Sequence, residues 1–109
     1  MSLPTLEKNI RKQRDLDFYL NNLRRCMPEL KKKYAVKSLG VFGSYVRKEQ
    51  IDTSDIDILI DFEKPIGLIA FIGLETFLSE NLKIKVDLVS KGALYGKIGQ
   101  KILSEVIYL

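Results

Sequence analysis

Two aspartates at the start of an apolar segment are the first residues of this chain whose types and spacing favour chemistry. Asp55 and Asp57 are two positions apart, and the alternating isoleucines of the run Ile56 to Phe62 predict a strand. Residues i and i+2 of a strand point to the same face, so both carboxylates project together while Ile56 points into the core. Two like charges held this close repel each other, and a divalent cation is the natural compensation. The alternative is a solvated pair at the edge of a strand.

A third aspartate interrupts another short apolar segment. Asp87 lies in the run Ile84 to Val89, which also predicts a strand, and its two neighbours face the opposite side. An acid in the middle of such a strand needs a partner or a site, because burying an unpaired carboxylate is costly. If this strand lies beside the run Ile56 to Phe62 with matched faces, Asp87 joins Asp55 and Asp57. We therefore predict three carboxylates on one face of a sheet.

A Gly-Ser pair follows the apolar run Val36 to Phe42, which predicts a strand that ends in a turn. Glycine lets the backbone turn sharply and approach a phosphate closely, while the following N–H groups and a hydroxyl can donate to phosphate oxygens. Taken alone, Gly43-Ser44 is equally an ordinary turn. Beside three carboxylates, it predicts a site for a phosphate and a metal.

The composition excludes several kinds of site. The chain has no histidine, which excludes Ser-His and Cys-His nucleophile pairs and histidine-ligated zinc or iron. Its single cysteine, Cys26, can form neither an internal disulfide nor a cysteine zinc site, and we interpret it as a core or half-buried helix residue. Any bound metal must therefore take oxygen ligands, which favours magnesium, manganese or calcium.

The net charge of +4 is unevenly distributed along the 109 residues. Residues 1–34 carry nine Lys or Arg against four acids, and the remaining residues carry nine against ten. A basic segment could attract nucleic acid, but no aromatics interleave these charges, so we favour a solvated helix face and expect no direct nucleic-acid binding. We see neither a secretory signal nor an apolar run long enough to span a bilayer, and we expect a cytoplasmic domain without a membrane segment.

The elements that must position the candidate residues follow from the spacing of the apolar side chains. We predict one α+β domain over residues 1–109, a small mixed β-sheet flanked by helices, with a helical segment at 1–34 and a core at 35–109. The predicted helices run from Thr5 to Tyr34 (with a break or a new first turn at Pro28), from Leu68 to Leu82 and from Gly96 to about Ile107. The predicted strands are Val36 to Phe42, Ile56 to Phe62 and Ile84 to Val89, and residues 45–54 form a loop with at most one helical turn.

The quoted motifs carry a family resemblance. The run LGVFGSYVRKEQIDTSDIDILIDF, residues 39–62, resembles the core motif of the minimal nucleotidyltransferases of bacteria and archaea. Gly43-Ser44, ten residues and then Asp55-x-Asp57 resemble the signature of their superfamily, which includes DNA polymerase beta and the kanamycin nucleotidyltransferases. KVDLVS at 85–90 is similar to their third-carboxylate strand, and KILSEVIYL at 101–109 to their usual carboxyl end. The resemblance implies the polymerase beta-like nucleotidyltransferase fold, with the catalytic core at 35–109.

The resemblance also implies roles for the three carboxylates. Asp55 and Asp57 would ligate magnesium, or manganese in its place, and bridge it to the triphosphate of ATP. Asp87 would ligate a second metal or accept the proton of the attacking hydroxyl. An acceptor hydroxyl would attack the α-phosphorus and release pyrophosphate, a reaction that depends on positioning and on charge neutralisation by metal.

For the turn, the resemblance implies that Gly43 and Ser44 hold the β- and γ-phosphates. The family usually has Arg-Gly-Glu after the Gly-Ser turn, and this chain has Arg47, Lys48 and Glu49. Arg47 would pair with a phosphate or brace the loop against Glu49. If the position of Lys48 needs a positive φ angle, its side chain strains the backbone by roughly 1 kcal/mol. The alternative is that Lys48 adds positive charge at the nucleotide.

Minimal nucleotidyltransferases occur beside a small all-helical partner, the HEPN-type ribonuclease toxin. The resemblance therefore implies that this chain is the antitoxin, which transfers AMP from ATP to a tyrosine of that toxin. A binding module that blocks the toxin sterically, without catalysis, is one alternative. Half of a split aminoglycoside-type nucleotidyltransferase is another. We expect apolar surface for the partner on the helix after Gly67 and near Ile102, Val106 and Tyr108.

Overall fold

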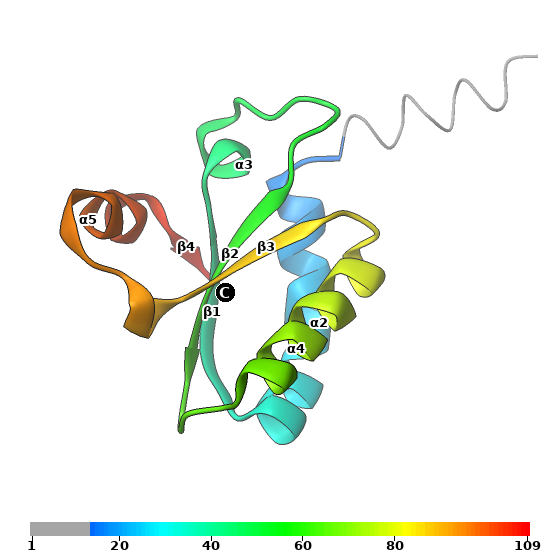
Figure 1. Cartoon of the computed structure of the whole chain (residues 1–109). Coiled ribbons are helices and arrows are strands. Elements are labelled where there is room, and N and C mark those ends of the chain that lie inside the picture. Colours follow the sequence, from blue (N-terminus) through cyan, green and yellow to red (C-terminus); the bar gives the residue numbers. More distant parts are fainter. Residues whose placement is uncertain (1–13) are drawn as a thin grey trace, which may run out of the picture.

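The protein is described by a computed structural model in which residues 14–109 are placed. A four-stranded sheet with the order β3-β2-β1-β4 lies at its centre. The helices α2 and α4 lie together on one side of this sheet and α5 lies on the opposite side (Figure 1). The elements are α2 (Leu16–Tyr34), β1 (Val36–Phe42), α3 (Ser44–Arg47), β2 (Ile56–Phe62), α4 (Leu68–Leu82), β3 (Val86–Ser90), η1 (Lys91–Ala93), α5 (Gly96–Glu105) and β4 (Ile107–Tyr108). This confirms the predicted α+β class and the mixed sheet flanked by helices.

The helix α2 begins after Asp15, whose side chain accepts a hydrogen bond of 3.2 Å from the Phe18 N–H and caps the first turn. Thr5, where the predicted helix starts, lies outside the described residues, and within them the helix begins at Leu16. The predicted break at Pro28 is wrong, because α2 continues through this proline. Leu23 and Leu30 on either side of it are fully buried, and their shared packing holds the helix together despite the missing N–H.

Alternation along β2 builds the core on one side of the sheet and the candidate site on the other. Ile56, Ile58 and Ile60 are completely buried with side chains from α2 and α4. Asp57 therefore projects from the opposite face, the side on which α5 lies (Figure 1). The strand β2 is antiparallel to β1 and parallel to β3, so it is the central element that both neighbours align to.

The strand β3 is the outer strand of the sheet next to β2, and α4 closes its free edge. The Val86 N–H donates to Ser79 Oγ at 3.1 Å, and the Leu88 N–H donates to Glu75 Oε2 at 3.1 Å. These side chains satisfy amides that would otherwise be open to another strand. The strand begins at Val86, two residues later than predicted, because α4 ends with Lys83 in the left-handed conformation.

The carboxyl end adds a strand that the sequence analysis did not predict. The last helix ends at Glu105 rather than near Ile107, and β4 then pairs with β1 through Gly40↔Tyr108. A side chain at Gly40 would not fit, since an added Cβ would lie 2.7 Å from Val106 Cγ2. The close approach of β4 to β1 therefore depends on a glycine inside β1. In residues 14–109 no helix is long and apolar enough to cross a membrane.

Candidate active site

The Gly-Ser turn lies where β1 passes into α3. Gly43 has φ of 80° and ψ of −152°, a region that side chains rarely adopt. An added Cβ would lie 2.1 Å from Asp57 Oδ2, so a side chain at this position would displace the Asp57 carboxylate. The Gly43 carbonyl accepts hydrogen bonds from the N–H groups of Val46 (3.0 Å) and Arg47 (3.1 Å), which start α3 directly after the turn.

The register of β2 and β3 places two of the three predicted carboxylates side by side. Asp57 pairs with Asp87 across the parallel strands and with Phe42 across the antiparallel pair. Asp57 is half-buried, whereas the Asp87 side chain is exposed at the edge. Asp55 stands just before β2 with its side chain 41% exposed, 3.9 Å from the Lys85 ammonium. The matched faces required by the sequence analysis are present, and all three aspartates lie at the same end of the two strands.

Burial and the neighbouring carboxylates raise the pKa of Asp57. Its pKa is raised from 3.8 to about 6, first by burial, then by the charges of Asp87 and Asp55 and a hydrogen bond with Asp87. Arg47 acts in the opposite direction but is outweighed. At neutral pH the site therefore holds repelling negative charge that a cation would relieve.

These donors fit a hard divalent cation that is shared with a phosphate. Within residues 14–109, no three His, Cys, Asp or Glu side chains are gathered so as to hold a metal by themselves. Magnesium is normally held by one or two carboxylates together with substrate phosphates and water, so a closed protein cage is not required. The facing pair of Asp57 and Asp87 beside the Gly43 turn has this open character.

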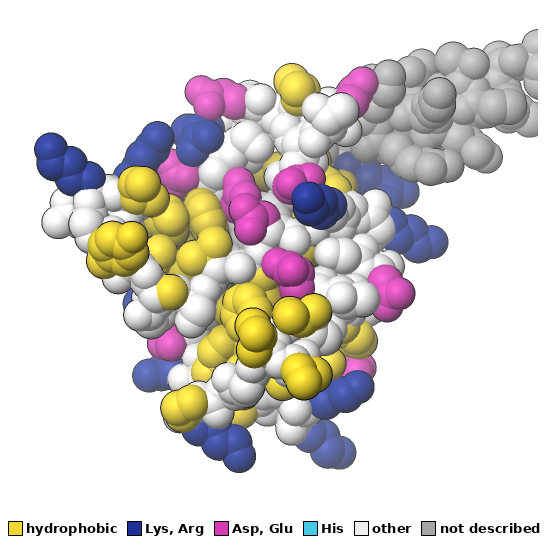
Figure 2. Space-filling view, viewed as in Figure 1, with side chains coloured by type: hydrophobic (Ala, Val, Ile, Leu, Met, Phe, Trp, Pro, Cys, Tyr) yellow, Lys and Arg dark blue, Asp and Glu magenta, His cyan; other side chains and the backbone are white. Residues whose placement is uncertain are grey.

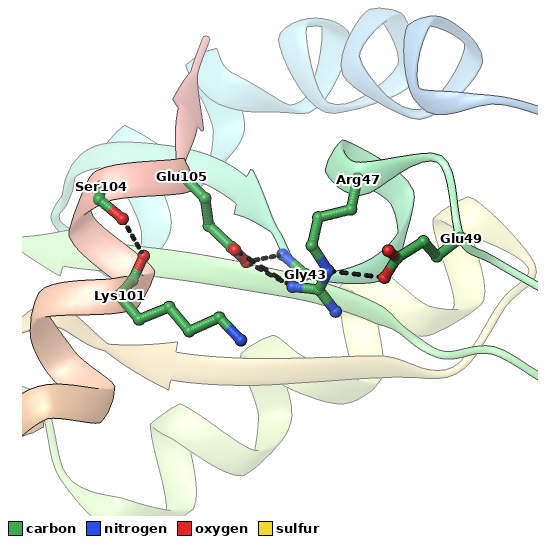
Figure 3. Close-up of polar contacts among 6 residues, drawn as sticks. All are labelled: Gly43, Arg47, Glu49, Lys101, Ser104 and Glu105. Carbon is green, nitrogen blue, oxygen red and sulfur yellow. Dashed lines mark hydrogen bonds and ion pairs between the residues drawn. The ribbon is translucent and has the colours of Figure 1, made fainter.

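Hydrogen bonds and ion pairs of Glu105 and Arg47 hold the Gly43-Ser44 turn. The sequence analysis did not predict a role for Glu105. The Gly43 N–H donates to Glu105 Oε2 at 2.6 Å, and both Glu105 oxygens accept from Arg47 Nη1 at 3.1 and 3.0 Å. Arg47 Nε donates to Glu49 Oε1 at 2.9 Å (Figure 3). Arg47 thus braces the loop against Glu49, as one predicted alternative required, and also binds the end of α5. The only signal for Glu105 was its place in the carboxyl-terminal run KILSEVIYL.

The residues from Ser44 to Glu49 connect the turn to the hydrophobic core and to the following loop. Tyr45 is buried and meets Tyr19 of α2 edge to face at 5.2 Å, so it packs in the core rather than stacking on a base. Burial and its contact with Tyr19 raise the pKa of Tyr45 to about 12, which keeps the hydroxyl protonated. Ser44 accepts the Glu49 N–H at 2.9 Å through its carbonyl, and Lys48 adopts φ of 60° as α3 ends.

Apolar patches lie on either side of this acidic centre. Figure 2 shows acidic side chains in the middle of one face, with apolar side chains over α5 on one side and over α4 on the other. The most exposed of them are Leu68, Ile69 and Ile72 of α4, and Tyr95 and Ile98 near α5. The start of α4 also borders an open pocket of about 350 Å³. The exposed apolar surface predicted after Gly67 is confirmed. Near the carboxyl end the prediction is right only for Tyr108, which is 43% exposed, whereas Ile102 and Val106 are half-buried.

Two named proteins are similar in sequence to this chain over most of its length. A protein of Methanocaldococcus jannaschii named "putative protein adenylyltransferase" is 51% identical over 88 residues, which cover 80% of this chain and 90% of the relative. The protein adenylyltransferase MntA of Thermococcus cleftensis is 47% identical over 81 residues, which cover 74% of this chain and 82% of the relative.

Solved structures share the fold. A structure described as a "putative minimal nucleotidyltransferase" has a TM-score of 0.72 and 31% identity, and the match covers 89% of this chain and 98% of that one. A toxin-antitoxin with AMP-PNP has a TM-score of 0.63 and 25% identity, covering 84% and 69%. A tri-AMPylated HEPN toxin of Shewanella oneidensis in complex with its MNT antitoxin has a TM-score of 0.62 at 22% identity, covering 83% and 70%, and shows the same fold.

A family assignment follows from the turn, the facing aspartates and these relatives together. The description of the family that matches residues 21–109 is "Nucleotidyltransferase domain". With that match over most of its length, and with relatives about half identical to it, this chain belongs to the nucleotidyltransferase domain family.

Proposed function

We propose that this chain is a magnesium-dependent protein adenylyltransferase, which transfers AMP from ATP to a hydroxyl of a partner protein. The observation that carries the proposal is the facing pair of Asp57 and Asp87 beside the Gly43 turn. The names of the relatives, both protein adenylyltransferases, support the reaction class, and the AMP-PNP in a related structure supports an adenine nucleotide.

In the proposed reaction the chain positions two reactants and absorbs charge. The Gly43-Ser44 turn holds the β- and γ-phosphates of ATP, and Arg47 adds one guanidinium beside them. Asp55 and Asp57 hold magnesium, which when bound neutralises charge on the triphosphate. Asp87, the exposed member of the pair, takes the proton of the acceptor hydroxyl or binds a second ion. The acceptor oxygen bonds to the α-phosphorus as the bond to the β-phosphate oxygen breaks, and pyrophosphate leaves.

The proposed acceptor is a tyrosine of a small helical HEPN-type toxin, for which this chain is the antitoxin in the cytoplasm. The apolar patches over α4 and α5 support a protein partner, because they flank the acidic centre and would be covered by it (Figure 2). Related structures are described as toxin-antitoxin complexes, which supports the same kind of partner.

The test is transfer to the partner itself. The chain, a HEPN-type toxin, ATP and magnesium are incubated together, and intact-mass spectrometry follows the toxin. We expect added AMP on the toxin, and we expect Asp57→Asn to abolish both the adduct and calorimetric binding of ATP with magnesium. Binding of ATP and magnesium by Asp57→Asn with wild-type affinity would contradict the metal assignment.

A second candidate function is steric neutralisation of the same partner without transfer. Two observations favour it: Arg47 is already paired with two carboxylates, and Lys48 strains a position at which the family carries glycine. A stable complex that never yields an AMP adduct, with magnesium or with manganese, would replace the enzymatic proposal by this one.

A further inference from the structure

Glu105 ties the carboxyl end of the chain to the phosphate turn. It is the last residue of α5 and lies 62 positions from Gly43, yet its carboxylate accepts the Gly43 N–H at 2.6 Å. Its side chain is only 15% exposed, so this charged hydrogen bond is partly shielded from water. A contact of this kind is short and strong, and it fixes a backbone atom rather than a flexible side chain.

The hydrogen bond to Glu105 is one of three contacts that hold Gly43 in place. The carbonyl accepts two N–H groups of α3, the Cα faces Asp57, and the N–H is held by Glu105. Glycine has more backbone freedom than any other residue, so a glycine in an unusual conformation must be held by its surroundings. The turn is therefore set in shape before any nucleotide arrives.

Glu105 also holds Arg47, which is the residue that ends α3. Arg47 binds Glu105 with Nη1 and Glu49 with Nε, so one guanidinium links the tail, α3 and the following loop (Figure 3). The Glu49 side chain is 65% exposed and that of Glu105 is 15% exposed. The Glu105 contact is thus the better shielded half of the brace, and the Glu49 contact is the one more open to screening by water and salt.

We infer that Glu105 is a positioning residue of the nucleotide site, which holds the Gly43-Ser44 turn and Arg47 in the geometry that accepts a triphosphate. The inference rests on the proposed function of that turn. Glu105 touches no reacting atom in this role, because it acts through Gly43 and Arg47. A carboxylate that instead competed with phosphate for the same donors would have the opposite effect on affinity, and this difference makes the role testable.

The test compares ATP binding in the presence of magnesium for the wild type, Glu105→Ala, Glu105→Gln and Glu49→Ala in the full chain. We expect Glu105→Ala to weaken binding about tenfold, because ordering the freed turn costs conformational entropy. Glu105→Gln should lie between it and wild type, because its amide oxygen can accept the Gly43 N–H but cannot replace the ion pair. Glu49→Ala is the matched control, which removes the other carboxylate on Arg47 and should change affinity by less than about twofold.

A second readout does not depend on activity. In the wild type the Gly43 amide proton should resonate downfield and exchange slowly, and Glu105→Ala should remove both properties while Glu49→Ala keeps them. Glu105→Ala that binds ATP as well as the wild type, or more tightly, would overturn the inference and leave the proposed function standing. A wild-type chain that binds no ATP would instead contradict the proposed function. If Glu105→Ala does not fold, Glu105→Gln against Glu49→Ala decides in the same way.

Discussion

Asp57 lies against the Gly43 backbone and near two further carboxylates and one arginine, and these three charged groups all affect its pKa. Burial contributes most to its raised pKa, and the charge of Asp87 contributes next. A nucleotide site that stores repulsion of this kind is stabilised by a cation and destabilised without one. The price in stability appears in the free protein, where it can be measured directly.

We expect Asp57→Asn to raise the thermal midpoint of the free chain at pH 8 but not at pH 4. The folded state raises the pKa of Asp57 from 3.8 to about 6, so it binds this proton more tightly than the unfolded state does. Stability is therefore lost as pH rises through that window, and a neutral side chain escapes the loss. Asp61→Asn, on the same strand but at its far end, is the control. A lower midpoint for Asp57→Asn at pH 8 would show that the charge is not repelled.

Asp87→Asn should spare the fold and most ATP affinity while abolishing transfer. Its side chain is exposed at the edge of the sheet, so the fold loses no buried contact. The proposed role lies in the chemical step, and the loss should therefore appear in turnover rather than in binding. Calorimetry with ATP and magnesium, and AMP incorporation measured by mass spectrometry, separate the two effects. Transfer within a few-fold of wild type would make Asp87 structural.

At the scale of elements, β2 does most to build the site, and the sequence predicts it because a large apolar side chain recurs at every second position from Ile56 to Phe62. The alternation of buried isoleucines with Asp57 and Asp61 fixed both its core face and its site face. The strand β4 could not be predicted in the same way, because its two residues carry no period and it forms only by pairing with β1 beside Gly40. The role of Glu105 could not be predicted either. Its contact with Gly43 depends on where α5 ends, and α5 ends where the chain turns to pair β4 with β1.

The residue that follows α3 is a lysine in a conformation that suits glycine. Lys48 has φ of 60°, and Lys83 at the end of α4 has φ of 56°. We expect Lys48→Gly and Lys83→Gly each to raise the free energy of unfolding by about 1 kcal/mol, because glycine adopts this region without steric cost. Chemical denaturation of both variants measures it, and Lys83, which follows α4, is the matched control. Destabilisation by Lys48→Gly alone would mean that the Lys48 side chain makes a contact worth more than its strain.

At the scale of the whole molecule, the site lies between two apolar patches, one over α4 and one over α5. The α4 patch and the α5 patch border an acidic centre that points outward (Figure 2). The turn and the aspartates come from the sheet, whereas the flanking apolar surface comes from helices on its two sides (Figure 1). A partner that brings an acceptor hydroxyl to this centre is therefore placed to contact both patches.

We therefore expect Ile69→Glu and Ile98→Glu to weaken binding of a HEPN-type toxin by at least about tenfold, because a charge at the centre of an apolar contact must be desolvated without a partner. Ile69 is 87% exposed and Ile98 is 77% exposed, so neither change should disturb the core or ATP binding. Lys97→Glu, next to Ile98 on an exposed position of α5, is the control for added charge. Calorimetry of each variant with the toxin, and separately with ATP and magnesium, measures both properties. If one variant loses the toxin and the other binds it normally, the partner covers one patch only. If both bind it as tightly as the wild type, neither patch is the interface, and the acceptor must approach the aspartates from the remaining side.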